Sequence, residues 1–139
     1  MDVYVDEWLV SVNCIMAKTG HGGNKLRLYQ KFKFDCETET YVNILMPYSH
    51  RSALAKFRTG VAPIRLETGR YERLDVNNRI CPICNIGIED EMHVLLKCST
   101  YTEIRQLLLQ KARSVNTMFN SYNDIEMLCF LLSDERFVK

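Results

Sequence analysis

The chain has 139 residues, a net charge of +1, an apolar fraction of 47% and a charged fraction of 25%, values typical of a globular protein rather than a disordered one. Its apolar stretches are too short to span a membrane, and the acidic start of the chain does not resemble a basic signal peptide. We therefore expect one domain of ordinary size, inside the cell, in the nucleus or the cytoplasm, and not in a membrane.

The first third of the chain predicts a helix, a break and a second helical stretch. Apolar residues at helical spacing over residues 3–17 predict an amphipathic helix. The glycines of residues 21–24 predict a linker. Residues 24–34 alternate basic and apolar side chains, which favours a helix and leaves a strand as the alternative.

A further helix is predicted over residues 50–59. Ser49 is a plausible N-cap, and Gly60 is well placed to end the helix. Arg58 is expected on or beside the solvent-facing side of this helix. The pattern predicts an exposed basic helix with one apolar side.

Short capped helices are predicted for the rest of the chain. Pro63 predicts a short helix through Glu67, with Gly69 after its end. Asp90 can cap the next helix. Ser99 or Thr100 can cap the one after that, and Ser121 with Asp124 resembles a capping box that starts the last helix. The expected N-caps of these helices are therefore Asp90, Ser99 or Thr100, and Ser121.

The chain contains six cysteines, and no secretory signal favours a disulfide framework for them. Three of them, Cys14, Cys36 and Cys129, are scattered in apolar surroundings. Free cysteine is commonly a small buried side chain. We therefore expect these three to be ordinary core residues.

The remaining three cysteines cluster with one histidine. Cys81, Cys84, His93 and Cys98 have the spacing C-x2-C-x8-H-x4-C. Zinc prefers four soft or borderline ligands in a tetrahedron, and a set of four protein ligands leaves no open position for substrate. We expect one structural zinc ion, and we expect the helix that carries His93 to break or tighten at Lys97–Cys98 so that the last sulfur can reach the metal.

Signals of catalysis are absent from the sequence: it has no paired aspartates, no glycine-rich phosphate loop and no nucleophile elbow. We expect no enzymatic activity. The predicted fold class is mainly α, a small helical domain with one Cys3His zinc knuckle. The predicted segments are an N-terminal amphipathic helix (1–20), a Gly-rich linker (21–24), a basic helical segment (25–80), the zinc knuckle with its following helix (81–114) and a C-terminal helix (115–139).

Positive charge gathers immediately before the cluster. Residues 49–80 carry seven Lys or Arg against three Asp or Glu. Such a segment can simply be the solvated face of helices, but beside a zinc knuckle it favours contact with nucleic-acid phosphates. Candidate stacking residues are Tyr48, Phe57 and Tyr71, with the core as their alternative location. The predicted nucleic-acid-binding residues are Arg51, Lys56, Arg58, Arg65, Arg70, Arg73 and Arg79.

The run from Ser49 to Tyr71, the Arg79–Cys84 segment, the Glu89–Cys98 segment, and Tyr101 with Arg105 together resemble a known family. They are similar to the C-terminal region of non-LTR (LINE-like) retrotransposon reverse transcriptases, including its zinc-binding tail. The resemblance covers roughly residues 24–114. It implies zinc ligands at the four positions of the cluster.

The same resemblance implies that the chain binds RNA or DNA as the tail of an enzyme that copies RNA into a nicked chromosomal target. The Tyr-x-Asp-Asp polymerase motif and a nuclease domain are not found in this sequence. We therefore expect a tail module whose polymerase domain would lie N-terminal to it. The alternatives are a structural or protein-interaction zinc module, and a remnant of an element without function.

Overall fold

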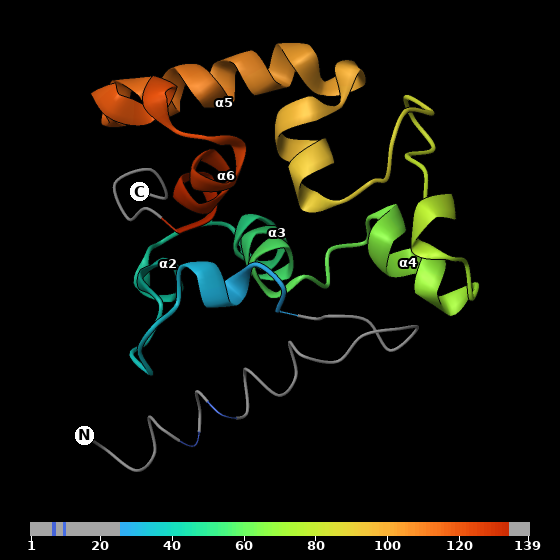
Figure 1. Cartoon of the computed structure of the whole chain (residues 1–139). Helices are drawn as coiled ribbons and strands as arrows, with labels where there is room; N and C mark the ends of the chain where they lie inside the picture. The colour runs from blue at the N-terminus through green and yellow to red at the C-terminus, as the bar shows by residue number, and fades with distance from the viewer. Residues whose placement is uncertain (1–6, 8–9, 11–25, 134–139) are drawn as a thin grey trace. The chain divides into compact units, whose positions relative to one another are not determined.

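The computed structural model describes Glu7, Val10 and residues 26–133 (Figure 1). The chain falls into two compact units, residues 1–62 and 63–139. Apart from Glu7 and Val10, which are helical, the helix predicted over residues 3–17 lies outside the described residues, as does the linker at 21–24. The fold class is confirmed, since the described residues are mainly helical.

From residue 26 onward, the described part of the first unit contains one 3-10 turn and two α-helices. Their bounds are η1 Tyr29–Lys31, α2 Thr40–Asn43 and α3 Tyr48–Thr59. The helix favoured over residues 24–34 is therefore only a single 3-10 turn among its described residues. Helix α3 begins earlier than predicted and is not capped by Ser49: Pro47 precedes it, and the Pro47 carbonyl accepts from the amides of His50 and Arg51, both at 3.1 Å.

The end of α3 agrees with the prediction. Gly60 has a φ of 71°, in the left-handed region that favours glycine. Its amide donates to the carbonyls of Lys56 and Phe57 in the last turn of the helix. Gly60 thus satisfies carbonyls that would otherwise lack partners, and the chain turns away.

A buried cation organises the first unit. The Arg58 side chain is only 3% exposed, and its guanidinium lies 4.5 Å from the ring centroid of Phe32 and 5.1 Å from that of Tyr41. Its Nη2 donates to Glu39 Oε2, while the Tyr29 hydroxyl donates to Glu39 Oε1 at 3.0 Å. Burial, helped by this carboxylate, raises the pKa of Tyr29 to about 12, so the hydroxyl remains a donor. The expected solvent-facing position of Arg58 is therefore wrong, because two aromatic rings and one carboxylate replace water around it.

Replacing Glu39 by glutamine tests this arrangement. The amide keeps the shape of the side chain but leaves the buried Arg58 charge without its counter-ion. We expect Glu39→Gln to lower the free energy of unfolding by about 3 kcal/mol, measured by urea denaturation. Glu37→Gln is the matched control, since Glu37 is exposed. Equal stability of the two variants would contradict the role given to Glu39.

Over its described residues, 63–133, the second unit contains three α-helices linked by short 3-10 and π segments. In chain order they are α4 Arg65–Tyr71, η2 Val76–Asn78, the π-helix η3 His93–Lys97, η4 Ser99–Tyr101, α5 Thr102–Val115, η5 Thr117–Ser121 and α6 Asp124–Ser133. Helix α4 starts two residues after Pro63, and Gly69 lies inside it rather than after its end. Ser99 opens the 3-10 turn η4 and does not cap α5, which has no side-chain cap.

The capping box of the last helix lies two residues later than predicted. Asn123 Oδ1 accepts from the amides of Ile125 and Glu126, both at 3.0 Å. In return, Glu126 Oε2 accepts from the Asn123 amide at 2.8 Å. This reciprocal pair is the capping arrangement, and it displaces Ser121, which ends η5.

The core of the second unit is aromatic and aliphatic. Phe119 and Phe130 have ring centroids 5.3 Å apart, and Ala112 and Leu131 complete the buried cluster. Leu96 of η3 packs against this cluster. The π-helix is therefore attached to the hydrophobic core.

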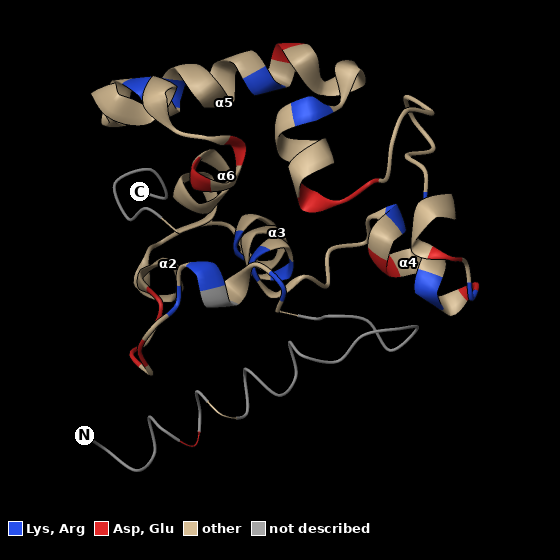
Figure 2. Cartoon of the chain, viewed as in Figure 1, with Lys and Arg blue, Asp and Glu red and all other residues tan. Residues whose placement is uncertain are grey.

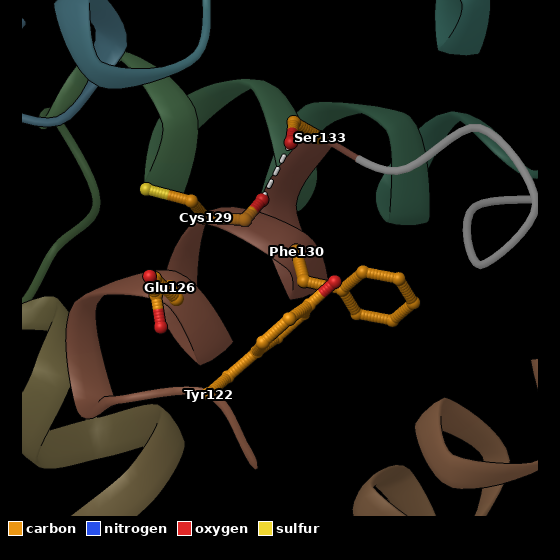
Figure 3. Close-up of a pocket in the computed structure, with 5 residues that line it drawn as sticks. All are labelled: Tyr122, Glu126, Cys129, Phe130 and Ser133. Atoms are coloured by element: carbon orange, nitrogen blue, oxygen red, sulfur yellow. Dashed lines mark hydrogen bonds between the residues drawn. The ribbon is translucent and has the colours of Figure 1, made fainter. Parts of the chain in front are cut away.

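A shallow pocket of about 350 Å³ opens beside α6. Figure 3 shows the residues that line it, with the ring of Tyr122 beside that of Phe130 and the Ser133 hydroxyl donating to the Cys129 carbonyl at 2.6 Å. The polar groups that line the pocket form hydrogen bonds within the fold. In the part of the chain that the structure describes, no helix has the length and apolarity needed to cross a membrane.

Candidate metal centre

A tight turn brings the first two cysteines together. Ile80 and Ile88 form an isolated antiparallel bridge, and within it the Cys81 amide donates to the Gly87 carbonyl at 3.0 Å. The turn needs left-handed backbone at Asn85 (φ 56°) and at Gly87 (φ 71°), conformations that asparagine and glycine adopt most easily. The residues after the Cys-x2-Cys pair thus close the loop that aims both sulfurs inward.

The histidine enters from a capped helical turn. Asp90 Oδ1 accepts from the His93 amide at 2.6 Å, and the Asp90 carbonyl accepts from the Val94 amide at 3.0 Å. This confirms Asp90 as the cap. The cap fixes where the helix starts and so where the His93 ring projects.

A π-helix makes the His-x4-Cys spacing possible. In an α-helix, residues five apart differ by about 140° around the axis, so their side chains diverge. The Cys98 amide instead donates to the His93 carbonyl at 2.6 Å, five residues back, the bond of a π-helix. The expected break is confirmed at Cys98, whose ψ is 124°. The turn before it widens, however, and does not tighten.

The four predicted ligands converge. The donor atoms of Cys81, Cys84, His93 and Cys98 all lie within 4.8 Å of one another, and Cys84 Sγ lies 3.3 Å from His93 Nε2. A tetrahedral zinc ion with Zn–S bonds of about 2.3 Å places its sulfurs about 3.8 Å apart. The donors therefore fit one metal ion after small side-chain shifts. Cys81 and Cys98 are fully buried and Cys84 is partly exposed.

A buried glutamate lies beside one cysteine of the site. Glu89 is buried, and Cys81 Sγ lies 3.7 Å from Glu89 Oε1, to which the thiol can donate. Burial, together with the Glu89 charge, raises the pKa of Cys81. Burial acts in the same direction on Cys98, but hydrogen bonds with Thr100 and the other two thiols outweigh it, so the pKa of Cys98 is lowered. Three thiolates so close together repel one another, and a bound cation removes that repulsion.

Glu89 also joins the knuckle to α4. Its Oε2 accepts from the Arg65 amide at 2.6 Å, and its carbonyl accepts from the Leu66 amide at 3.0 Å. Glu89, which lies in the segment that carries the four ligands (residues 81–98), thus accepts hydrogen bonds from two backbone amides at the start of α4. The sequence carries no separate signal for this link between Glu89 and α4, which could therefore not be predicted from it.

Arg79 forms a second link between α4 and the knuckle. It is 3% exposed, and its Nη1 donates to the Leu66 carbonyl at 2.7 Å while its Nη2 donates to the Leu74 carbonyl at 2.8 Å. Gly69 leaves room for this side chain: a Cβ at Gly69 would lie 2.8 Å from Arg79 Cγ and 3.1 Å from its Cδ. Arg79 therefore needs glycine inside α4.

Gly69→Ala should accordingly destabilise the chain by about 1–3 kcal/mol, the cost of overpacking a buried site. In an Arg79→Ala background the obstruction is gone, and alanine should then stabilise the helix by up to about 1 kcal/mol relative to glycine. Urea unfolding of the four chains of this double-mutant cycle measures both effects. The same sign in both backgrounds would contradict the packing described.

The predicted nucleic-acid-binding residues differ widely in exposure. Arg58 and Arg79 are buried and donate to internal acceptors. Arg65 is paired with Glu72 at the surface, with Nη2 2.7 Å from Oε2. These three guanidinium groups have fixed partners within the fold.

The other four also differ in exposure. Arg70 is partly buried and bonds Glu67 with Nη1 at 2.8 Å, and Arg51 is partly buried and donates to the Ile44 carbonyl at 2.9 Å. Lys56 and Arg73 are exposed. Figure 2 shows the basic residues of α3 and α4 and the acidic start of the helix that leads into η3.

The candidate stacking residues and the cysteines outside the cluster differ in their exposure. Tyr48 and Tyr71, candidate stacking residues, are 83% and 79% exposed, whereas Phe57 is partly buried. Cys36 is exposed, so its predicted core location is wrong: it lies between two charged residues, Asp35 and Glu37, that are exposed as well. Cys129 is partly buried, and Cys14 lies outside the described residues.

No known protein family, no curated protein and no solved structure matches the chain. The geometry therefore carries the conclusion by itself. A small helical domain holds a Cys3His group that could bind one metal ion.

Proposed function

We propose that the chain is a structural zinc module. The observation that carries the proposal is the convergence of three sulfurs and one imidazole nitrogen within 4.8 Å. Thiolate-rich sites with one imidazole suit zinc, whereas carboxylate and carbonyl sites suit magnesium or calcium. Because all four positions of a tetrahedron are then filled by the protein, the metal has no open position, and the proposed role is structural and not catalytic.

The role of the metal would be to hold the second unit together. The ligands come from the Cys-x2-Cys turn and from the two ends of η3, so one metal ion would join these two segments at a single point. Structural zinc can supply on the order of 10 kcal/mol of folding free energy, comparable with the whole stability of a small domain. Folding of residues 79–98 would therefore depend on zinc.

Elemental analysis of the purified chain should find one zinc ion per chain, and a strong chelator should lower its melting temperature. Cys84→Ser should lose the zinc and melt at the temperature of the chelated wild type, because one ligand of the tetrahedron is missing. Cys36→Ser is the control, since Cys36 is an exposed cysteine of the first unit. A metal-free chain whose melting is unchanged by chelator would refute the proposal.

We propose further that this module contacts nucleic acid, as the resemblance to retrotransposon reverse-transcriptase tails implies. One pair of residues supports it: Tyr71 at the end of α4 is 79% exposed, and Arg73, two residues later, is exposed as well. An exposed aromatic ring can stack on a base, and a nearby guanidinium can bind a phosphate. In this proposal the chain has no catalytic role of its own, and a polymerase domain would act beside it.

Binding of a fluorescent single-stranded oligonucleotide over a range of salt concentrations separates the two contacts. Arg73→Gln should reduce the slope of log affinity against log salt by about 0.7, the effect of one phosphate contact on a single strand. Tyr71→Ala should weaken binding by about 1–3 kcal/mol at every salt concentration without changing the slope. The control is Arg113→Gln, which removes the same charge from α5.

Absence of wild-type binding at low salt would contradict the nucleic-acid proposal, and so would an equal effect of Arg113→Gln.

The alternative, a protein-interaction module, has one observation in its favour. Ile104 and Leu107 lie three residues apart on α5 and are 70% and 71% exposed. Residues at this spacing share one face of a helix.

A further inference from the structure

The segment between η3 and α5 is where the last ligand is positioned. The chain turns sharply there, through the 3-10 turn η4 (Figure 1). Cys98 stands at the bend with extended backbone (φ −58°, ψ 124°). Its carbonyl therefore leaves the helical direction: it accepts from the Tyr101 amide of η4 at 3.3 Å and has a second lone pair for another donor.

Arg105 supplies this second donor. From the first turn of α5 its Nε donates to the Leu95 carbonyl at 3.1 Å, and its Nη2 donates to the Cys98 carbonyl. One rigid guanidinium thus joins a carbonyl inside the π-helix to the carbonyl of the ligand residue itself. A fork of two donors in one plane is a property of arginine that lysine lacks.

Both peptide groups of Cys98 are consequently fixed. On one side its amide donates to the His93 carbonyl at 2.6 Å, and on the other its carbonyl accepts from Arg105. The side chain is fully buried. Only the rotation of the Cys98 side chain remains to place its sulfur.

Helix stability does not explain the position of Arg105. A cation in the first turn of an α-helix is opposed by the helix dipole, and Arg105 is the fourth residue of α5. Its charge does suit the neighbouring metal centre. Three thiolates, one neutral imidazole and Zn²⁺ would carry a net charge of −1, which a nearby guanidinium stabilises.

We propose that Arg105 is a positioning residue of the metal centre, which holds Cys98 in the place where its sulfur completes the tetrahedron. This inference rests on the proposed zinc function. It makes zinc affinity depend on a residue that is not a ligand. Loss of such supporting hydrogen bonds around metal ligands commonly weakens metal binding about 10- to 100-fold.

The test measures zinc affinity by competition with a chromophoric chelator, using the full chain. Arg105→Gln should bind zinc about 10- to 100-fold more weakly than the wild type. Arg113→Gln is the matched control: Arg113 lies on the same helix, is exposed and bonds Asn120 at 2.9 Å. Its zinc affinity should stay within about twofold of the wild type.

Arg105→Lys guards against simple loss of folding, because it keeps the charge and the length of the side chain. It should fold with wild-type helix content by circular dichroism and yet release zinc faster than the wild type, since one ammonium cannot bind both carbonyls in the same geometry. Folded Arg105 variants with wild-type affinity and release rate would overturn the inference while leaving the zinc proposal intact. A wild-type chain that takes up no zinc would overturn both.

Discussion

Three thiols and an imidazole within 4.8 Å of one another impose the constraint on which the second unit depends. Without a cation, the thiols can ionise together only against strong mutual repulsion, and Glu89 adds a further negative charge beside Cys81. When a metal ion is bound, the negative charges of the thiolates are attracted to that one cation. The fold of this unit makes physical sense as a frame that brings these donors together and keeps them there.

The frame consists of hydrogen bonds and one apolar contact that attach the segment around the four ligands to neighbouring elements. Glu89 and Arg79 attach the loop to α4, and Arg105 attaches the end of the π-helix to α5. Leu96 anchors the π-helix in the aromatic core around Phe119. Most of these bonds end on backbone carbonyls or amides, so the position of the loop depends on backbone geometry more than on particular surface side chains.

The features that could be predicted from the sequence are those fixed locally. The ligand spacing identified the metal group, and Gly60 and Asp90 were identified as helix boundaries because each acts on the turn beside it. The features that could not be predicted depend on contacts between distant residues. Arg58 belongs to a basic helix, and only the fold brings Phe32, Tyr41 and Glu39 around it. The widened turn before Cys98 is a similar case, since the ligand spacing requires a departure from the α-helix but does not specify which one.

X-ray absorption at the zinc edge of the purified chain tests the central claim most directly, because it reports which atoms surround the metal and at what distance. The account predicts three sulfurs at about 2.3 Å and one nitrogen at about 2.0–2.1 Å, with no bound water. A shell with fewer sulfurs, or one that includes water oxygen, would contradict the closed Cys3His site, since it would show that Cys81, Cys84, His93 and Cys98 do not together hold the ion.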